Sequence, residues 1–161
     1  MFKLKSKMVE DAATGLKGYL THMYVEGNGS VMYRFQPYGL NKKTGEPMIG
    51  MIIARVRIKG GEEVAEPDDM PNHILNTEVE EITTGFKGTV TSLCLHESGC
   101  VHAVVQPKGI NVETGQVVNP KECNVRDLKG KAIKVKSENT LAKEQKKKPS
   151  PMMGVTIGRF C

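Results

Sequence analysis

Short runs in which apolar and polar residues alternate recur along the chain, and glycine, proline or asparagine separates one run from the next. Alternation with a period of two is typical of β-strands that bury one face, and glycine-rich breaks are typical of hairpin turns. The pattern predicts strands at 18–25, 30–36, 48–59, 88–96, 100–106 and 123–128, with turns at 39–45 and 108–115. We therefore expect an all-β protein with almost no helix.

The same arrangement of strands and turns occurs twice. Thr-Gly-φ-Lys-Gly, where φ is an apolar residue, occurs at 14–18 and again at 84–88, and Gln-Pro occurs at 36–37 and again at 106–107. The offset of about 70 residues stays constant as far as the Lys-Gly pair at 129–130, and it is too long for the unit of a solenoid. The chain therefore holds a small domain twice, with four or five short strands in each copy.

The Thr-Gly-φ-Lys-Gly motif predicts the shape of each copy. Two glycines around one apolar residue and one lysine allow a tight turn into the first strand. The apolar side chain, Leu16 or Phe86, is expected to fill the end of a barrel, and the lysine is expected to stay outside. Sharp corners of this kind suit a small five-stranded barrel. The predicted fold class is all-β, with two tandem small SH3-like β-barrel modules plus an extended C-terminal arm.

The composition changes between the copies and again after the second one. We expect a first β-module at 1–60, an acidic linker at 61–80, a second β-module at 81–136, and a basic linker with an apolar C-terminal arm at 137–161. The linker contains prolines and adjacent glycines, and one helical turn is expected near 73–76. Modules of this size bury little apolar surface, so we expect the copies to pack on each other or on a partner.

The formal net charge is +5, and the basic excess lies in the C-terminal tail while the linker is acidic. Opposite charges at separate places favour self-association, although most charge runs are only solvated surface. The first ten residues lack the apolar core of a signal peptide, and no run is long enough to span a membrane. We expect a soluble protein made in a reducing cytoplasm, with no membrane partner.

The four cysteines are Cys94, Cys100, Cys123 and Cys161. Cys94 and Cys100 flank a predicted hairpin corner, with His96 and His102 nearby, but the spacing matches no standard zinc pattern. Buried, inert thiols are the favoured interpretation, with a disulfide and a metal site as alternatives. Cys161 ends the chain, and it is a candidate for a disulfide between subunits.

No known set of catalytic motifs is present. Lys43-Thr44-Gly45 matches one triplet of serine β-lactamases, but the companion motifs are missing, and the aligned Glu113-Thr114-Gly115 indicates that Thr-Gly marks a turn. No phosphate-binding loop, zinc-protease motif or nucleophile elbow occurs. We therefore predict no enzyme, and the predicted sites include no catalytic, cofactor-binding or metal-binding residue.

A basic small barrel with a lysine-rich tail suits nucleic acid, because lysines neutralise phosphates. Base stacking needs exposed aromatic side chains, however, and the aromatic candidates of the first copy align with non-aromatic residues of the second. A repeated nucleic-acid surface is expected to keep its chemistry in both copies. Nucleic acid is therefore the less favoured partner.

The C-terminal arm is the predicted contact with partners. Its last ten residues are mostly apolar and alternate as in a β-strand, so they suit addition to the sheet edge of a neighbouring subunit. The predicted partner-binding residues are Met152, Met153, Val155, Ile157, Arg159 and Phe160, and the predicted basic contacts are Lys146, Lys147 and Lys148. An arm folded back on its own second module is the alternative.

Three motifs of the second copy are T-G-F-K-G-x-V-T at 84–91, Gly-Cys at a hairpin corner at 99–100, and Val-Gln-Pro at 105–107. With them the copy resembles a family of short uncharacterised proteins of tailed bacteriophages and prophages. The first copy matches weakly, because Ser30 follows its corner glycine and Leu16 replaces the phenylalanine. The resemblance implies a phage origin, a small barrel that serves as a binding module and, by analogy, a place on the virion.

We therefore expect a non-enzymatic virion structural protein, made in the host bacterial cytoplasm, that acts as capsid cement or decoration or attaches to the tail. Its expected partners are phage capsid or tail proteins and further copies of itself. One alternative is an early host-interaction protein that sequesters a nucleotide signal or blocks a defence factor; it predicts a pocket between the modules lined by Lys17, Lys87, Arg34 or Arg55. A nucleic-acid-binding small barrel is the second alternative.

Overall fold

The computed structural model describes residue 4, residues 7–61, residue 64 and residues 66–133. Within them the chain is all-β, as predicted, and its ten strands pair antiparallel in a single sheet. Residues 131–133 are helical, and within the described residues no helix is long and apolar enough to cross a membrane.

Each copy contributes five strands, with a short 3₁₀ turn between its last two. The first half consists of β1 (Val9–Asp11), β2 (Lys17–Glu26), β3 (Val31–Pro37), β4 (Met51–Ala54), η1 (Arg55–Arg57) and β5 (Ile58–Lys59). The second half consists of β6 (Glu78–Glu81), β7 (Lys87–His96), β8 (Val101–Gln106), β9 (Lys121–Asn124), η4 (Val125–Asp127) and β10 (Leu128–Lys129). Between the halves lie η2 (Pro67–Asp69) and η3 (Asn72–Ile74), the latter where one helical turn was expected.

Strand order is the same in the two halves. In the first, β5 pairs with β1, β1 with β2, β2 with β3 and β3 with β4. The second repeats this order from β10 through β6, β7 and β8 to β9. A register shift interrupts β2 between Leu20 and His22, and one interrupts β7 between Val90 and Ser92, at equivalent places. The duplication is therefore present in the structure as well as in the sequence.

The halves join through β2 and β7, which pair antiparallel along their C-terminal parts. Tyr24 lies opposite Cys94 at the centre, and His22 opposite His96 and Glu26 opposite Ser92 lie on either side. Because Tyr24 and Cys94 are themselves equivalent in the repeat, an internal two-fold axis passes between them. The sheet that results is open and continuous, so the predicted pair of separate closed barrels is not confirmed.

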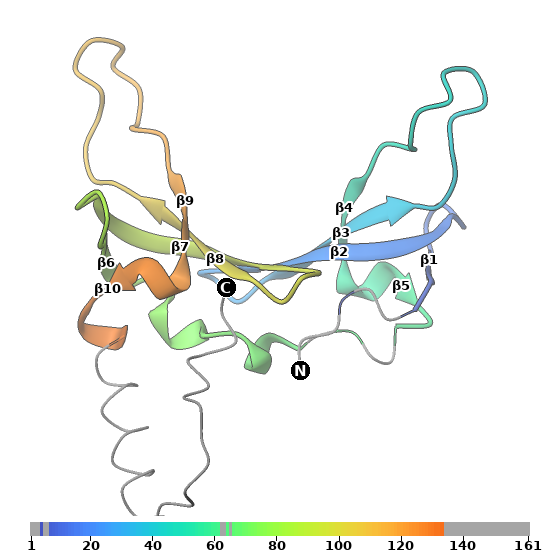
Figure 1. The fold of residues 1–161 in the computed structure, drawn as a ribbon, viewed down its shortest axis with the longest axis horizontal. Coiled ribbons are helices and arrows are strands. Elements are labelled where there is room, and N and C mark those ends of the chain that lie inside the picture. Colours follow the sequence, from blue (N-terminus) through green and yellow to red (C-terminus); the bar gives the residue numbers. More distant parts are fainter. Residues whose placement is uncertain (1–3, 5–6, 62–63, 65, 134–161) are drawn as a thin grey trace, which may run out of the picture.

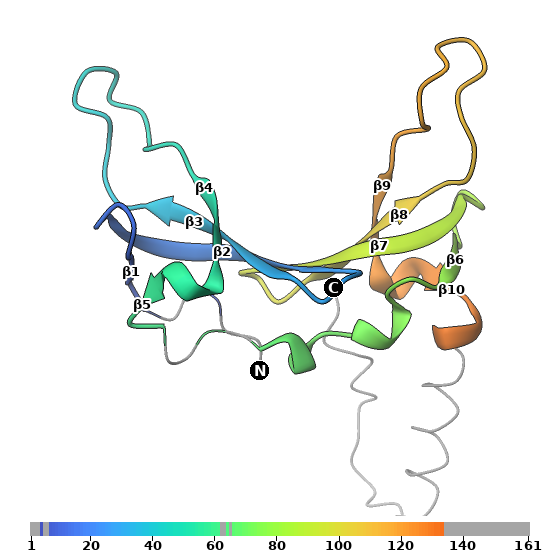
Figure 2. The ribbon, with the colours of Figure 1, turned by 180° about the vertical axis from the view of Figure 1, so that it is seen from behind.

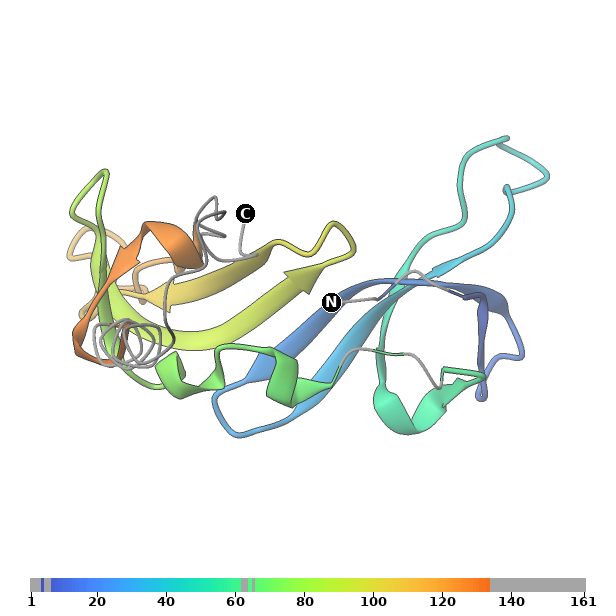
Figure 3. The ribbon, with the colours of Figure 1, turned by 60° about the horizontal axis from the view of Figure 1, so that its bottom comes forward.

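One hydrophobic core crosses the junction. Alternate residues of β2 and β7, such as Met23 and Leu95, are fully buried and lie opposite each other. Met70 and Ile74 from the linker belong to the same core, and the linker runs along this side of the sheet (Figures 1 and 3). Core formation therefore depends on both halves, as expected from their small size.

Two long loops leave the sheet on the side opposite the linker. The first long loop (38–50) connects β3 to β4, and the second long loop (108–120) connects β8 to β9 (Figures 1 and 2). The Gln36 side-chain amide donates to the Met48 carbonyl, and the Gln106 amide donates to the Val118 carbonyl at 2.7 Å. The repeated Gln-Pro pair therefore ties together the two strands at the base of each loop.

The repeated Thr-Gly sequence belongs to a turn that occurs four times. The turns span Asp11–Gly15, Asn41–Gly45, Glu81–Gly85 and Asn111–Gly115, and in each the glycine N–H donates to the first residue's carbonyl. The backbone dihedral angle φ of these glycines lies between 68° and 74°, a conformation that is strained for a residue with a side chain. In each turn the first residue's side chain accepts backbone N–H bonds, and the threonine hydroxyl accepts another. The turns Asn41–Gly45 and Asn111–Gly115 lie within the first and second long loops.

The apolar residue of the Thr-Gly-φ-Lys-Gly motif, Leu16 or Phe86, has different surroundings in the two halves. Phe86 packs against the core, and the Lys121 ammonium lies 5.6 Å from its ring centre. Leu16 is exposed, so the expectation that it fills the end of a barrel is wrong for the first half. Lys17 and Lys87 are exposed, as predicted.

Candidate functional site

The open face of the central sheet carries a cluster of chemically active side chains at the junction of the halves. Because side chains alternate across a strand, the residues between the buried ones on β2 and β7 point away from the core. They include His22, His96 and Cys94, of which Cys94 is itself buried, and neighbouring strands add His102 from β8 and Glu122 from β9. This face looks toward the side on which the long loops rise.

The rings of this cluster are in close contact. The centroids of His22 and His96 are 4.3 Å apart, and those of His96 and His102 are 4.7 Å apart. Oε1 of Glu122 lies 2.6 Å from Nδ1 of His102 and 3.5 Å from Nε2 of His96. The ligand atoms of His96, His102 and Glu122 lie within 4.8 Å of one another, as do those of His22, Cys94 and His96.

The cluster changes the acidity of its members. Partial burial lowers the pKa of His22, and the neighbouring His96 and Arg34 lower it further. The hydrogen bond to His102 lowers the pKa of Glu122, against the opposing effect of burial. Burial raises the pKa of the Cys94 thiol to about 12, and the Glu122 charge adds to this. Around neutral pH the thiol is therefore protonated.

The cluster breaks the internal symmetry of the sheet. The repeat places Tyr24 opposite Cys94 and Ser92 in the position of His22. The positions equivalent to His96, His102 and Glu122 hold Glu26, Met32 and Ile52. The first half therefore contributes His22 alone to the cluster, and the second half contributes Cys94, His96, His102 and Glu122.

Sequence reasoning found only part of this site. It placed Cys94, His96 and His102 near one another, and the predicted buried thiols are confirmed for Cys94 and Cys123, which are free and buried. For Cys100 the prediction of an inert thiol is wrong, because this residue is disulfide-bonded, as the disulfide alternative had it. Sequence reasoning did not connect His22 and Glu122 with the cluster. Both residues reach the cluster through the order of strands in the sheet. The only signal for His22 was its place on the polar face of the predicted strand at 18–25, and Glu122 precedes the predicted strand at 123–128 by one residue.

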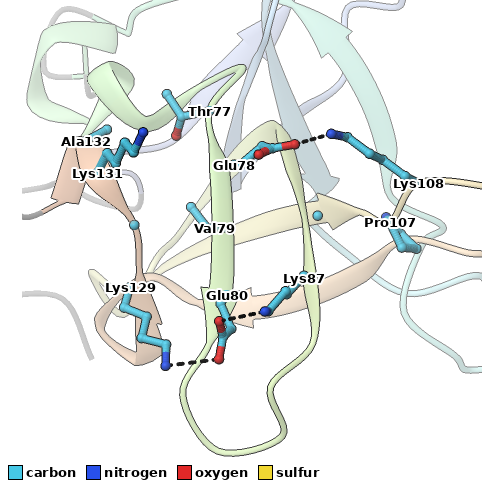
Figure 4. A pocket seen from close by; sticks show the side chains of 12 residues that line it. Thr77, Glu78, Val79, Glu80, Lys87, Pro107, Lys108, Lys129, Lys131 and Ala132 are labelled. Atoms are coloured by element: carbon cyan, nitrogen blue, oxygen red, sulfur yellow. Dashed lines mark hydrogen bonds and ion pairs between the residues drawn. The ribbon is translucent and has the colours of Figure 1, made fainter.

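A second candidate is a groove of about 1020 Å³ at the outer end of the second half (Figure 4). Its charged lining residues are Lys87, Lys108, Lys129, Lys131, Glu78 and Glu80. Glu80 pairs with Lys129 at 2.9 Å and with Lys87 at 3.3 Å, and Lys108 pairs with Glu78. Three of the four lysines are thus already matched by carboxylates, which weakens the groove as an anion site.

The basic residues expected around a nucleotide pocket lie apart. Lys87 lines this groove, while Lys17 lines the equivalent hollow of the first half, which measures about 330 Å³. Arg55 lines a third hollow of about 300 Å³ and pairs with Glu66, and Arg34 lies on β3, where it is exposed. The structure does not bring the four residues together.

The long loops form a third feature, because they expose large apolar side chains. The exposed ones are Tyr38, Leu40 and Ile49 in the first loop and Ile110, Val112 and Val117 in the second. Ile49 and Val112 are 89% and 91% exposed, close to the maximum for a folded chain. The two loops are related by the internal two-fold axis, so they present two similar apolar surfaces on one side of the molecule.

The predicted C-terminal contacts lie outside the described residues. This holds for Lys146, Lys147 and Lys148, for the arm residues from Met152 to Phe160, and for Cys161. Their predicted roles stay predictions.

The sequence matches no protein-family model, and neither a curated protein nor a solved structure is significantly similar to the chain.

Proposed function

We propose that the chain is a non-enzymatic structural protein of a bacteriophage virion, which binds a capsid or tail lattice through its two long loops. The C-terminal arm then joins neighbouring copies by strand addition. The phage origin rests on the resemblance of residues 84–107 to phage and prophage proteins. The binding role rests on the shape and chemistry of the described residues.

The observation that carries this proposal is the pair of equivalent apolar loops. Large apolar side chains that gather on an exposed loop, rather than being scattered singly over the surface, are typical of a binding site. Here the surface lies on two loops held by the same sheet, and the Gln36 and Gln106 hydrogen bonds support them. Two similar sites at a set separation suit a partner that offers the same surface twice, as a lattice of identical subunits does.

Each half is best described as an open SH3-like module. Its strand order, with a long bent second strand and a 3₁₀ turn between the last two strands, supports this interpretation. In each half the second strand also pairs with the other half, which leaves the module open. We propose that this junction exists to orient the two loops.

The proposal is tested by placing charges on the loops and counting the protein in purified particles. One variant carries Leu40→Asp and Ile49→Asp, a second carries Ile110→Asp and Val112→Asp, and a third carries all four. Losing one of two linked contacts costs about 100-fold or more in avidity, so each pair is expected to deplete the particle and all four to abolish incorporation.

Val56→Asp is the matched control. Val56 is 89% exposed and lies in η1, away from both loops, so its replacement is expected to leave incorporation unchanged. Circular dichroism establishes that each variant is folded. Normal incorporation of the folded four-residue variant would reject the loops as the binding surface.

The arm is tested separately by removing residues 152–161. We expect the truncated chain to fold and to bind isolated lattice subunits, while neighbouring copies no longer join one another. Strand addition would be rejected if particles carried normal amounts of the truncated protein and chemical cross-linking still joined its neighbouring copies.

A further inference from the structure

We propose that His96, His102 and Glu122 bind one divalent transition-metal ion, with Zn²⁺ the best match, and that His22 is the fourth ligand. The site is independent of the proposed virion role. It lies on the open face of the sheet, at the junction of the halves.

The donor atoms are already close to the positions that such an ion requires. In a tetrahedral site with metal–nitrogen distances near 2.0–2.1 Å, neighbouring ligand atoms are about 3.3 Å apart. Oε1 of Glu122 lies 2.6 Å from Nδ1 of His102 and 3.5 Å from Nε2 of His96. One ligand atom from each of the three residues lies within 4.8 Å of those of the other two, so small side-chain rotations are enough to complete the geometry.

The type of donor decides the type of metal. Two imidazoles and a carboxylate suit Zn²⁺ and its transition-metal neighbours, while Ca²⁺ and Mg²⁺ prefer sites built from oxygen. Glu122 is about half exposed, which leaves the site accessible from solvent.

The crowding of histidines also points to a ligand. Three of the chain's four histidines meet here, and their ring centroids are 4.3 Å and 4.7 Å apart. Imidazole nitrogen is a common ligand of Zn²⁺, so three rings in contact offer several donors to one ion.

His22 connects the proposed metal site to the junction of the two halves. It lies on β2 of the first half, directly opposite His96 on β7 of the second half. An ion held by both histidines joins the two halves across the strand pair that carries the internal two-fold axis. Metal binding is therefore expected to stabilise the junction.

The test is titration of the full chain, with the disulfide of Cys100 intact and no thiol reductant, with Zn²⁺ by calorimetry and with Co²⁺ by visible absorption. We expect one ion per chain and the intense d–d bands of tetrahedral Co²⁺. The variants are His96→Ala and Glu122→Gln. Because loss of even an outer partner costs about 10–100-fold in metal affinity, removing a direct ligand is expected to cost about 100-fold or more.

His73→Ala is the matched control, since His73 lies in η3 and not in the cluster. It is expected to bind as the unaltered chain does. Absence of binding at one ion per chain would overturn the proposal, as would unchanged affinity in both ligand variants. Glu122→Gln replaces an exposed side chain, so it keeps the test valid if His96→Ala fails to fold.

Cys94→Ser tests the ligand set. The Cys94 thiol lies within 4.8 Å of the donor atoms of His22 and His96, so sulfur is the competing donor. We expect the variant to keep the Co²⁺ spectrum of the unaltered chain, with no sulfur-to-metal charge-transfer band in either. Loss of binding in Cys94→Ser would overturn the assignment to His96, His102 and Glu122.

Discussion

At the scale of single residues, the two glycines of Thr-Gly-φ-Lys-Gly serve different purposes. Gly85 has φ of 74°, a conformation that asparagine also tolerates. Gly88 has an ordinary φ, but a Cβ there would run into the Gln106 carbonyl of the neighbouring strand. The first glycine is required by the turn, and the second is required by the close approach of two strands.

Gly88→Ala is therefore expected to destabilise the fold by about 1–3 kcal/mol, the usual cost of overpacking. Gly85→Asn is expected to cost clearly less, because its surroundings are open. Urea denaturation of both variants measures the difference. Equal losses would show that the strand contact at Gly88 is not the constraint.

Glu81 is expected to make stability depend on acid pH. Hydrogen bonds from the Thr84 hydroxyl and from the backbone N–H groups of Thr83 and Thr84 lower its pKa from 4.5 to about 2. A carboxyl group whose pKa is lowered by folding stabilises the protein above its unfolded pKa. That contribution is lost as pH falls from about 4.5 to about 2.

Glu81→Gln is expected to lower the melting temperature near neutral pH and to flatten its dependence over this acid range. The control is Glu113→Gln, which changes an exposed residue of the second long loop. Melting curves at several pH values make the comparison. An unchanged acid slope in Glu81→Gln would contradict the role of this turn.

At the scale of elements, strands with strong alternation and glycine-bounded turns were predictable from the sequence. Four strands begin and end within one residue of their predicted limits, namely β2, β3, β7 and β8. β1 and β6 were missed, because they are three and four residues long and carry acidic side chains. Asp11 is buried because the Arg57 guanidinium donates to both of its carboxylate oxygens and the groups of its turn donate as well. Glu81 is buried because the N–H groups and a hydroxyl of its turn satisfy it. Neither set of contacts is visible in a hydrophobic pattern.

The long loops are expected to depend on the glutamines at their bases. Gln106→Glu keeps the shape of the side chain but removes the N–H donor to the Val118 carbonyl, which costs about 1 kcal/mol. Hydrogen exchange of residues 108–120 is expected to accelerate, while residues 38–50 stay unchanged. Equal exchange in both loops would show that Gln106 does not hold the second loop.

At the scale of the whole molecule, the duplication was predictable and the way in which the copies join was not. The pairing of β2 with β7 connects residues about 70 positions apart, and no local pattern specifies it. The same limit applied to the histidine cluster: His96 and His102 are close in sequence, but His22 and Glu122 come from distant strands. Strand order therefore decided both the architecture and the candidate metal site.

The shared core predicts that the halves unfold together. All four tyrosines lie in the first half, so tyrosine fluorescence reports on that half. Leu128→Ala removes a buried side chain from β10 in the second half, at a cost of about 2–5 kcal/mol. We expect the tyrosine transition to shift to lower urea by this amount. A tyrosine transition that stays in place would show two independent modules.

The most direct test of the proposed virion role is quantitative mass spectrometry of purified, nuclease-treated phage particles, compared with the soluble fraction of infected cells. The account predicts the chain in the particles at a constant ratio to the lattice protein, from one preparation to the next. Its absence from particles, with abundant protein in the soluble fraction, would contradict the account and leave a host-interaction role as the alternative to pursue.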